Sequence, residues 1–232
     1  MGDAEIVDSL GSSASDLRVS LFADLKIVKC GLDFEHQARS EGFAVIAGID
    51  EVGRGCLAGP VVAAACVLDL EKPLPKGLND SKKLTAKQRE EIGGELREAA
   101  LAFAVGQIEA DEIDRINILQ ATMRAMASAV ASLDPKPEFL LIDAVKLREI
   151  PIPQKSIIKG DAISASIAAA SVIAKVYRDR LMHDYHQTYP QYSFHEHVGY
   201  ATKTHRDAIR THGPSPIHRL SFRGVLIEEE AE

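Results

Sequence analysis

The sequence predicts a single-domain α/β fold in which a buried sheet is flanked by helices. Its 232 residues make a long single domain but are too few for two domains of ordinary size. Short apolar segments alternate with longer segments of helical periodicity, which is typical of this class. Hydrophobic residues make up 46% and charged residues 26% of the chain, which excludes a disordered or fibrous protein.

The two ends of the chain differ in composition from the part between them. Residues 1–15 are rich in Gly, Ser and Asp and have no hydrophobic periodicity, so we expect a disordered lead without chemistry. Residues 20–42 are compatible with one or two short helices. We therefore divide the chain into this lead, a core domain over residues 16–224 and an acidic tail over residues 225–232.

Apolar, β-compatible segments predict the strands of the sheet. They are residues 43–50 (FAVIAGID), 59–68 (GPVVAAACVL), 102–110 (AFAVGQIEA), 138–144 (EFLLIDA) and 155–161 (KSIIKGD, which runs into a turn).

Capping signals and periodicity predict the helices. Thr85 and Gln88 form a T-x-x-Q capping box for a helix that runs to about residue 100. Apolar residues spaced by threes and fours over residues 116–133 predict one amphipathic helix, stopped at Asp134-Pro135. An Ala/Ser-rich helix is expected from about residue 162 to 185, and a shorter one between Thr202 and residue 212.

Charge is distributed unevenly along the chain. The net charge of -7 argues against a nucleic-acid partner, but phosphate contacts are local and charge must be assessed by region. Residues 1–145 carry 15 Lys and Arg against 24 Asp and Glu, whereas residues 146–223 carry 12 against 6. The second region also holds seven of the eight histidines. A basic C-terminal region is thus compatible with binding a nucleic acid.

Cysteine usage and hydropathy predict the compartment. Cys30, Cys56 and Cys66 form no C-x-x-C pair, and Cys56 and Cys66 lie in apolar or Gly-rich stretches where free thiols pack. The first residues have no basic segment followed by an apolar one, and no apolar run reaches transmembrane length. We expect a monomeric cytoplasmic protein without membrane contact.

Acidic residues stand where apolar strands end. Asp50 and Glu51 close the first strand, Asp143 closes the fourth, and Asp161 follows the fifth at a predicted helix start. A carboxylate at the end of a buried strand costs free energy unless it is solvated, paired or metal-bound, so the repetition indicates a common site. Adjacent residues on a strand point to opposite faces, so Asp50 and Glu51 share a site only if the chain turns there.

Each acid also has a purely structural interpretation. Asp161 is well placed to be a plain helix N-cap, and Asp143 to form an Asx-turn at the strand end. The Asp50-Glu51 pair fits such a role less well, because two adjacent acids on an apolar strand raise each other's pKa without a cation. Together the four acids favour a metal site.

The ligand types favour a hard cation. Clustered carboxylates suit Mg²⁺ or Mn²⁺, whereas zinc more often recruits Cys and His. Two such ions can activate water and stabilise the leaving 3′-oxygen of a phosphodiester. His183, His186, His195 and His197 could be a second metal cluster, but with no Cys nearby we interpret them as solvated residues.

The acids are followed directly by a glycine-rich loop. Gly53 and Gly55 let backbone amides approach a sugar-phosphate while Arg54 supplies charge, although a tight turn with a solvent-facing Arg is the simpler interpretation. GRGCLA also matches the dinucleotide fingerprint G-x-G-x-x-[GA] of NAD-dependent oxidoreductases. Pro60 and the β-prone VVAAACVL argue against the helix that this fingerprint requires.

Three further residues are candidates for contact with nucleic acid. Lys82 and Lys83 in NDSKKL stand just before a helix N-terminus, where a phosphate binds well, and a solvated turn explains them equally. Tyr200 in HVGYATK could stack on a sugar or base, or be a half-buried core aromatic.

Taken together, these motifs resemble the type 2 ribonuclease H family, ribonuclease HII, from about residue 46 to 222. The blocks that carry the resemblance are GIDEVGRG, NDSKKL, NILQATMRAM, LLIDA, KGD followed by SIAAASVIAKVYRD, YPQYSFHEHVGY and HGPSPIHRLSF. It implies a ribonuclease H-like fold, with a central mixed sheet flanked by helices and a helical C-terminal extension that grips a duplex.

The resemblance also implies roles for these residues. Asp50, Glu51, Asp143 and Asp161 would be the catalytic acids, the first three as metal ligands. Residues 53–55 would read the 2′-hydroxyl, and Tyr200 would pack at that nucleotide. Two positions depart from the family pattern: Val198 lies where Lys is common and Leu220 where Arg is common, which puts two phosphate contacts in doubt.

The function expected from the sequence is endonucleolytic hydrolysis of the RNA strand of RNA/DNA hybrids, and incision 5′ to ribonucleotides embedded in duplex DNA, by two-metal-ion catalysis. The products would carry a 3′-hydroxyl and a 5′-phosphate. The implied biology is ribonucleotide excision repair and primer removal. The alternatives are an NAD-type oxidoreductase built on GRGCLA and a non-catalytic nucleic-acid-binding module with structural acids.

Overall fold

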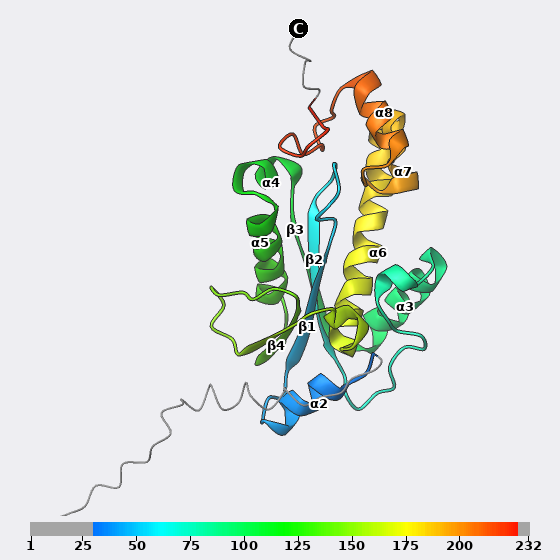
Figure 1. Cartoon of the computed structure of the whole chain (residues 1–232). Coiled ribbons are helices and arrows are strands. Elements are labelled where there is room, and N and C mark those ends of the chain that lie inside the picture. Colours follow the sequence, from blue (N-terminus) through cyan, green and yellow to red (C-terminus); the bar gives the residue numbers. More distant parts are fainter. Residues whose placement is uncertain (1–29, 227–232) are drawn as a thin grey trace, which may run out of the picture.

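A computed structural model of the chain describes residues 30–226 (Figure 1). Its centre is a five-stranded mixed sheet in the order β3-β2-β1-β4-β5. The strands β1, β4 and β5 are mutually parallel, while β2 pairs antiparallel with both β1 and β3. The strands are β1 (Ile46–Val52), β2 (Val61–Leu68), β3 (Ala100–Ile108), β4 (Phe139–Asp143) and β5 (Gln154–Ile157).

Helices cover both faces of this sheet (Figure 1). Helices α4 and α5 lie on one face and α3 and α6 on the other, while α7 and α8 extend the structure beyond the end of the sheet opposite to α2. The helices are α2 (Asp33–Ser40), α3 (Ala86–Ala99), α4 (Ala110–Ile116), α5 (Ile118–Ala131), α6 (Ala165–Thr188), α7 (Phe194–His197) and α8 (Lys203–His212).

The central strands are apolar on both sides because both faces are covered. All eight residues of β2 are buried. Val61 and Ala63 belong to the cluster that packs against α5, and the alternate residues Val62 and Ala64 belong to the cluster against α6. Helix α6 approaches β1 closely at Gly48, where an added Cβ would lie 2.0 Å from a backbone carbon of Ser166.

The expected strands are present, with shifted boundaries. The first strand begins three residues later than predicted and continues through Glu51 to Val52. The capping box at Thr85 is formed as expected, and Thr202 caps α8, which ends at residue 212 before Gly213 at φ 72°.

One helix prediction was wrong. The expected single helix over residues 116–133 is divided at Asn117 into α4 and α5. Asn117 has φ 70°, and its side chain accepts hydrogen bonds from the amides of Leu119 and Gln120, which starts a new helix. Leu119, expected on the apolar face, is 46% exposed.

The start of the long helix also differs from the prediction. Helix α6 begins at Ala165, three residues later than expected, and its N-cap is Ser164, whose side chain accepts from the amide of Ile167. Asp161 lies instead in a short 3₁₀ turn over Gly160–Ala162. The plain N-cap interpretation of Asp161 is therefore wrong.

The proposed lead over residues 1–15 lies outside the described residues, as do residues 227–232 of the tail. Val225, which we placed in that tail, is buried in the C-terminal hydrophobic cluster. No helix between residues 30 and 226 is long and apolar enough to cross a membrane.

Candidate active site

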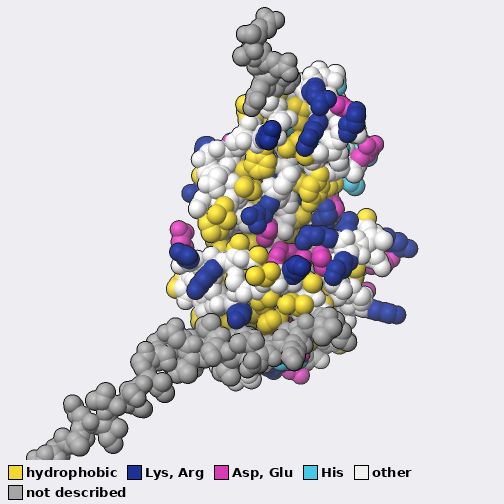
Figure 2. Space-filling view, in the orientation of Figure 1, with side chains coloured by type: hydrophobic (Ala, Val, Ile, Leu, Met, Phe, Trp, Pro, Cys, Tyr) yellow, Lys and Arg dark blue, Asp and Glu magenta, His cyan; other side chains and the backbone are white. Residues whose placement is uncertain are grey.

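The four predicted acids lie at one edge of the sheet. Because β1, β4 and β5 are parallel, their carboxyl ends meet there. Asp50 and Glu51 lie near the end of β1, Asp143 is the last residue of β4, and Asp161 follows β5. We call these four residues the acidic cluster. Figure 2 shows acidic side chains gathered near the middle of one face, with Lys and Arg side chains around them.

Asp50 is the most strongly perturbed acid of the cluster. The residue is 3% exposed, and its Oδ1 accepts a hydrogen bond from the amide of Glu51 at 2.8 Å. Burial, and then the charge of Glu51, raise the pKa of Asp50 to about 8, against a hydrogen bond from Ser171 on α6 that lowers it. The folded protein therefore holds this carboxylate at an electrostatic cost.

Glu51 and Asp143 are perturbed in the same direction. Burial raises the pKa of Glu51, although its ion pair with Arg54 at 3.3 Å opposes the shift. Burial also raises the pKa of Asp143, whose Oδ1 accepts from the amide of Gly160 at 2.7 Å. The charge of Asp143 contributes to the raised pKa of both Asp50 and Glu51, so the three carboxylates interact.

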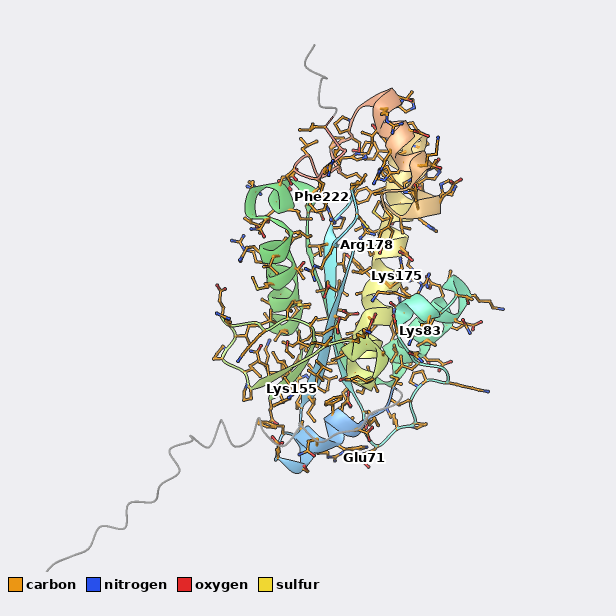
Figure 3. The ribbon with its side chains drawn as sticks, in the orientation of Figure 1. Glu71, Lys83, Lys155, Lys175, Arg178 and Phe222 are labelled. Carbon is orange, nitrogen blue, oxygen red and sulfur yellow. The ribbon has the colours of Figure 1, made fainter. Side chains whose placement is uncertain are left out.

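Asp161 is held by a lysine that sequence reasoning assigned to phosphate binding. Asp161 is 4% exposed, and its Oδ2 lies 3.0 Å from Nζ of Lys82. Burial of its ammonium tends to lower the pKa of Lys82, but the hydrogen bond to Asp161 and the charge of Asp161 raise it overall. The ammonium of Lys82 thus contacts the acidic cluster although its side chain is 76% exposed. Lys83, at the end of the same short 3₁₀ turn, is also exposed (Figure 3).

We expected Asp50 and Glu51 to share a site only if the chain turned between them, and it does not turn there. Both pair in register with β2, and the chain turns only at Gly53, with φ 88°. Strand alternation alone would direct Asp50 and Glu51 to opposite faces. The charge of Glu51 nevertheless raises the pKa of Asp50, so the two carboxylates interact where β1 ends. Among residues 30–226, no three His, Cys, Asp or Glu side chains stand close enough together to hold a metal ion as they are placed.

The glycine loop, residues 53–59, joins β1 to the antiparallel β2. A strand follows this loop, whereas the dinucleotide fingerprint requires a helix, so the oxidoreductase alternative is wrong. Arg54 projects from the loop with its side chain 42% exposed. An added Cβ at Gly53 would lie 2.2 Å from Nε of Arg178, so only glycine fits this close approach.

Two buried arginines support the glycine loop from behind, and sequence reasoning missed both. Arg178 on α6 donates to the carbonyl oxygens of Pro60, Ala58 and Val198 at 2.8–3.0 Å (Figure 3). Arg219 donates to the carbonyl oxygens of Gly59 and Arg54 at 2.8–3.0 Å. Both side chains are fully buried. No local sequence signal distinguishes them from surface arginines.

The glycine loop is joined to the segment that carries Tyr200. The amide of Leu57 donates to the carbonyl of Gly199 at 2.8 Å, and Arg178 bridges both segments. Tyr200 is 41% exposed, and Nζ of Lys175 lies 5.6 Å from the centroid of its ring. Tyr200 is therefore an accessible ring beside the glycine loop rather than a core aromatic.

Comparison with known proteins identifies the family. A family model described as Ribonuclease HII matches residues 47–225. The chain belongs to the ribonuclease HII family. It is 56% identical over 191 residues to a ribonuclease HII of Desulfitobacterium hafniense, with 82% of this chain and 73% of that protein covered. It is 54% identical over 198 residues to that of Syntrophobacter fumaroxidans, with 85% and 84% covered.

A solved structure confirms the fold. The ribonuclease H2 of Pyrococcus horikoshii OT3 aligns with a TM-score of 0.65 at 28% identity, over 78% of this chain and 95% of that one. The predicted family and its ribonuclease H-like fold, with a mixed sheet flanked by helices, are thus confirmed.

The histidines of this chain differ in part from our expectation. His183 and His195 are exposed, but His197, which we interpreted as solvated, is 7% exposed. His205 and His218 are also buried and hydrogen-bond to each other. At the two positions that depart from the family pattern, Val198 contributes a backbone carbonyl to Arg178 and Leu220 is 44% exposed.

Proposed function

We propose that this protein is a metal-dependent endonuclease that hydrolyses the RNA strand of RNA/DNA hybrids and incises duplex DNA 5′ to embedded ribonucleotides. The observation that carries the proposal is the acidic cluster at the carboxyl ends of three parallel strands, in a chain of the ribonuclease HII family. We propose 3′-hydroxyl and 5′-phosphate products.

The donor atoms of the acidic cluster suit a hard divalent cation, although among residues 30–226 the side chains would have to draw closer together than they stand here to hold one. Asp50, Glu51 and Asp143 offer only oxygen donors, and the pKa of each is raised by burial and by at least one neighbouring carboxylate. A cation relieves that repulsion, and carboxylate oxygens suit Mg²⁺ or Mn²⁺. When bound, such ions activate water and stabilise the leaving 3′-oxygen of a phosphodiester. Asp161 would complete the cluster once Lys82 turns from it to a phosphate.

The glycine loop and Tyr200 would distinguish ribose from deoxyribose. The carboxylates cannot do so, because phosphates look alike in both strands, whereas the 2′-hydroxyl marks RNA at a single nucleotide. Gly55 is exposed and would leave the loop backbone open to that hydroxyl, whereas Gly53 is buried against Arg178 and would hold the loop in place. Arg54 is exposed between them. Tyr200 presents its ring next to the loop, where it would pack on the sugar of the following nucleotide.

Positive charge around the acidic cluster would hold the phosphate backbone. Lys82 and Lys83 extend from the loop before α3, and Lys175 lies on α6 beside Tyr200 (Figure 3). We further propose that the protein works as a cytoplasmic monomer. In support of a reducing compartment, Cys30, Cys56 and Cys66 are all free thiols.

The proposal is tested on a DNA duplex that carries one ribonucleotide and a labelled 5′ end, with and without Mg²⁺. We expect one Mg²⁺-dependent incision on the 5′ side of the ribonucleotide, with a 3′-hydroxyl on the labelled product. An all-DNA duplex of the same sequence is the control. Tight binding without cleavage under any divalent cation would instead support the nucleic-acid-binding module.

A further inference from the structure

Three buried histidines connect the C-terminal part of the chain, residues 190–226, to Tyr200. His197 ends α7, His205 lies in the first turn of α8, and His218 lies in the loop after it. They are 7%, 0% and 2% exposed. Buried imidazoles must have their nitrogens paired, so their partners define their protonation states.

The partners of His205 fix its tautomer. Its Nδ1 lies 2.9 Å from the carbonyl oxygen of Tyr200, which can only accept, so Nδ1 carries the proton. The Nε2 of a neutral His205 is then an acceptor. It lies 3.0 Å from Nε2 of His218, which must therefore donate.

The contact between Ser215 and His218 independently requires the same protonation of His218. The amide of Ser215 donates to Nδ1 of His218 at 2.9 Å, and an amide can only donate. His218 thus accepts at Nδ1 and donates at Nε2, as the bond to His205 demands. We call this sequence of bonds, from Ser215 through His218 and His205 to the Tyr200 carbonyl, the histidine relay.

His197 braces the relay without belonging to it. Its Nδ1 accepts from the amide of Gly199 at 3.2 Å, and its Nε2 lies 2.8 Å from the carbonyl of Tyr192, to which it donates. Its ring stacks on that of His205 with centroids 4.4 Å apart. All nitrogens of the three rings are therefore paired in the neutral state. If His205 or His218 gained a proton, one of its N–H groups would face another N–H donor and that hydrogen bond would be lost.

We propose that the histidine relay positions Tyr200. His205 and His218 then determine specificity indirectly, because they hold the residue that reads the nucleotide. The inference rests on the proposed function, in which Tyr200 reads the nucleotide next to the ribonucleotide. Tyr200 is 41% exposed, so its position depends on its backbone. That backbone also hydrogen-bonds to the carbonyl of His197 and the amide of Thr202. The relay holds that backbone at the Tyr200 carbonyl, one residue beyond the Gly199 carbonyl that binds the glycine loop.

The electrostatics of the rings support a relay that stays neutral at physiological pH. Burial, partly opposed by the bond to the Tyr200 carbonyl, lowers the pKa of His205 to about 4. Burial and the neighbouring His205 lower that of His218 to about 4. His197 acts in the same direction on both rings. The other rings around His218 are those of Tyr192 and Phe194, at centroid distances of 4.8 and 5.7 Å.

The test compares two substrates, a duplex with one ribonucleotide and a long RNA/DNA hybrid, at one salt concentration because phosphate-driven binding depends steeply on salt. The readout is the ratio of kcat/KM on the first substrate to kcat/KM on the second. The variants are His218→Leu, which removes the relay, and His218→Gln, whose amide can still donate to His205. Ile209→Ala is the matched control, because Ile209 is buried in the same C-terminal cluster but makes no relay bond.

We expect His218→Leu to lower the ratio about two- to tenfold, the effect of one net hydrogen bond. His218→Gln should lower the ratio less than His218→Leu does. Ile209→Ala should leave the ratio unchanged even if it lowers the melting temperature as much as His218→Leu. In a Tyr200→Ala background, His218→Leu should have no further effect on the ratio, since the relay acts only through Tyr200.

The outcomes separate this inference from the proposed function. A wild type that cleaves neither substrate overturns the proposed function. If Tyr200→Ala lowers the ratio but both His218 variants leave it unchanged, Tyr200 reads the junction and the relay inference is wrong. The inference is equally overturned if His218→Leu lowers the ratio by the same factor with and without Tyr200, or if Ile209→Ala lowers it too. Should His218→Leu fail to fold, His218→Gln against Ile209→Ala decides alone.

Discussion

The acidic cluster and the histidine relay are both largely buried groups of titratable side chains, but their electrostatic states are opposite. In the acidic cluster, burial and like charges raise the pKa of Asp50, Glu51 and Asp143. In the relay every ring nitrogen has a complementary partner in the neutral state. A cluster with unrelieved repulsion is suited to bind a ligand of opposite charge, whereas a fully paired cluster is suited to hold structure.

The largest effect should come from neutralising the acidic cluster. We expect Asp50→Asn and Asp143→Asn each to abolish cleavage, because each removes a proposed metal ligand, while the fold is retained. The measurement is single-turnover cleavage of a hybrid, with circular dichroism to verify folding. Near-normal turnover with unchanged metal dependence would refute the assignment of these acids. Glu71→Gln, at an exposed ion pair with Arg39 far from the cluster (Figure 3), is the control.

Loss of the Tyr200 ring should have a smaller, substrate-dependent effect. Tyr200→Ala is expected to reduce kcat/KM on an embedded ribonucleotide by roughly ten- to a hundredfold, the scale of one stacking contact of about 1 to 3 kcal/mol. The loss on a long hybrid should be less. Tyr177→Ala serves as the control, because Tyr177 is a similarly exposed tyrosine on α6, away from the glycine loop. An equal loss on both substrates would mean that Tyr200 only supports the fold.

The two clusters should respond to pH with opposite signs. The pKa of His205 and His218 falls from 6.5 to about 4 on folding, so the unfolded chain binds more protons in that window. Their contribution to stability is present above pH 6.5 and is lost as the pH falls toward 4. Asp50, with its pKa raised from 3.8 to about 8, contributes the reverse, a loss of stability as the pH rises through that range.

These signs can be separated in one background. In Asp50→Asn, His205 and His218 should lower the free energy of unfolding by urea as the pH falls from 6.5 to 4, against the smaller opposite contributions of Glu51 and Asp143. The fall should be smaller when His218→Gln is added, because one depressed histidine is then absent. The same acid dependence with and without His218 would contradict the neutral relay.

The smallest effect concerns the chain's first residues. Deleting residues 2–15 should change neither melting temperature nor hybrid cleavage, because their Ser-rich, acidic composition has no hydrophobic periodicity with which to dock. A large loss in either quantity would show that this segment contacts the core. Deleting residues 33–40, which form α2 with Phe34 buried, is the contrasting case and should destabilise the protein.

The sequence was sufficient where the signal is local. Runs of apolar residues located the strands, the T-x-x-Q box located α3, and acids at strand ends located the acidic cluster. It failed at Asn117, where an unusual backbone angle divides one apolar periodicity into two helices. Nothing in the periodicity of residues 116–133 reveals that break.

The contacts that sequence reasoning missed are long-range. Arg219 binds the carbonyl of Gly59 across 160 positions, and Arg178 binds Ala58 across 120. An Arg that pairs with distant carbonyls is identical in sequence to one on the surface. His205 and His218 are likewise separated by the turn of α8, and only the folded C-terminal part brings their Nε2 atoms within 3.0 Å.

The most direct test of the central claim, that the acidic cluster is built to receive a divalent cation, is thermal unfolding of the wild type and Asp50→Asn at pH 7 with Mg²⁺ titrated from zero. Without Mg²⁺ we expect Asp50→Asn to be at least as stable as the wild type, because the amide keeps the oxygen that accepts from Glu51 and relieves the repulsion. Mg²⁺ should then raise the melting temperature of the wild type and not that of the variant. A less stable variant whose melting temperature rises with Mg²⁺ as much as that of the wild type would contradict the claim.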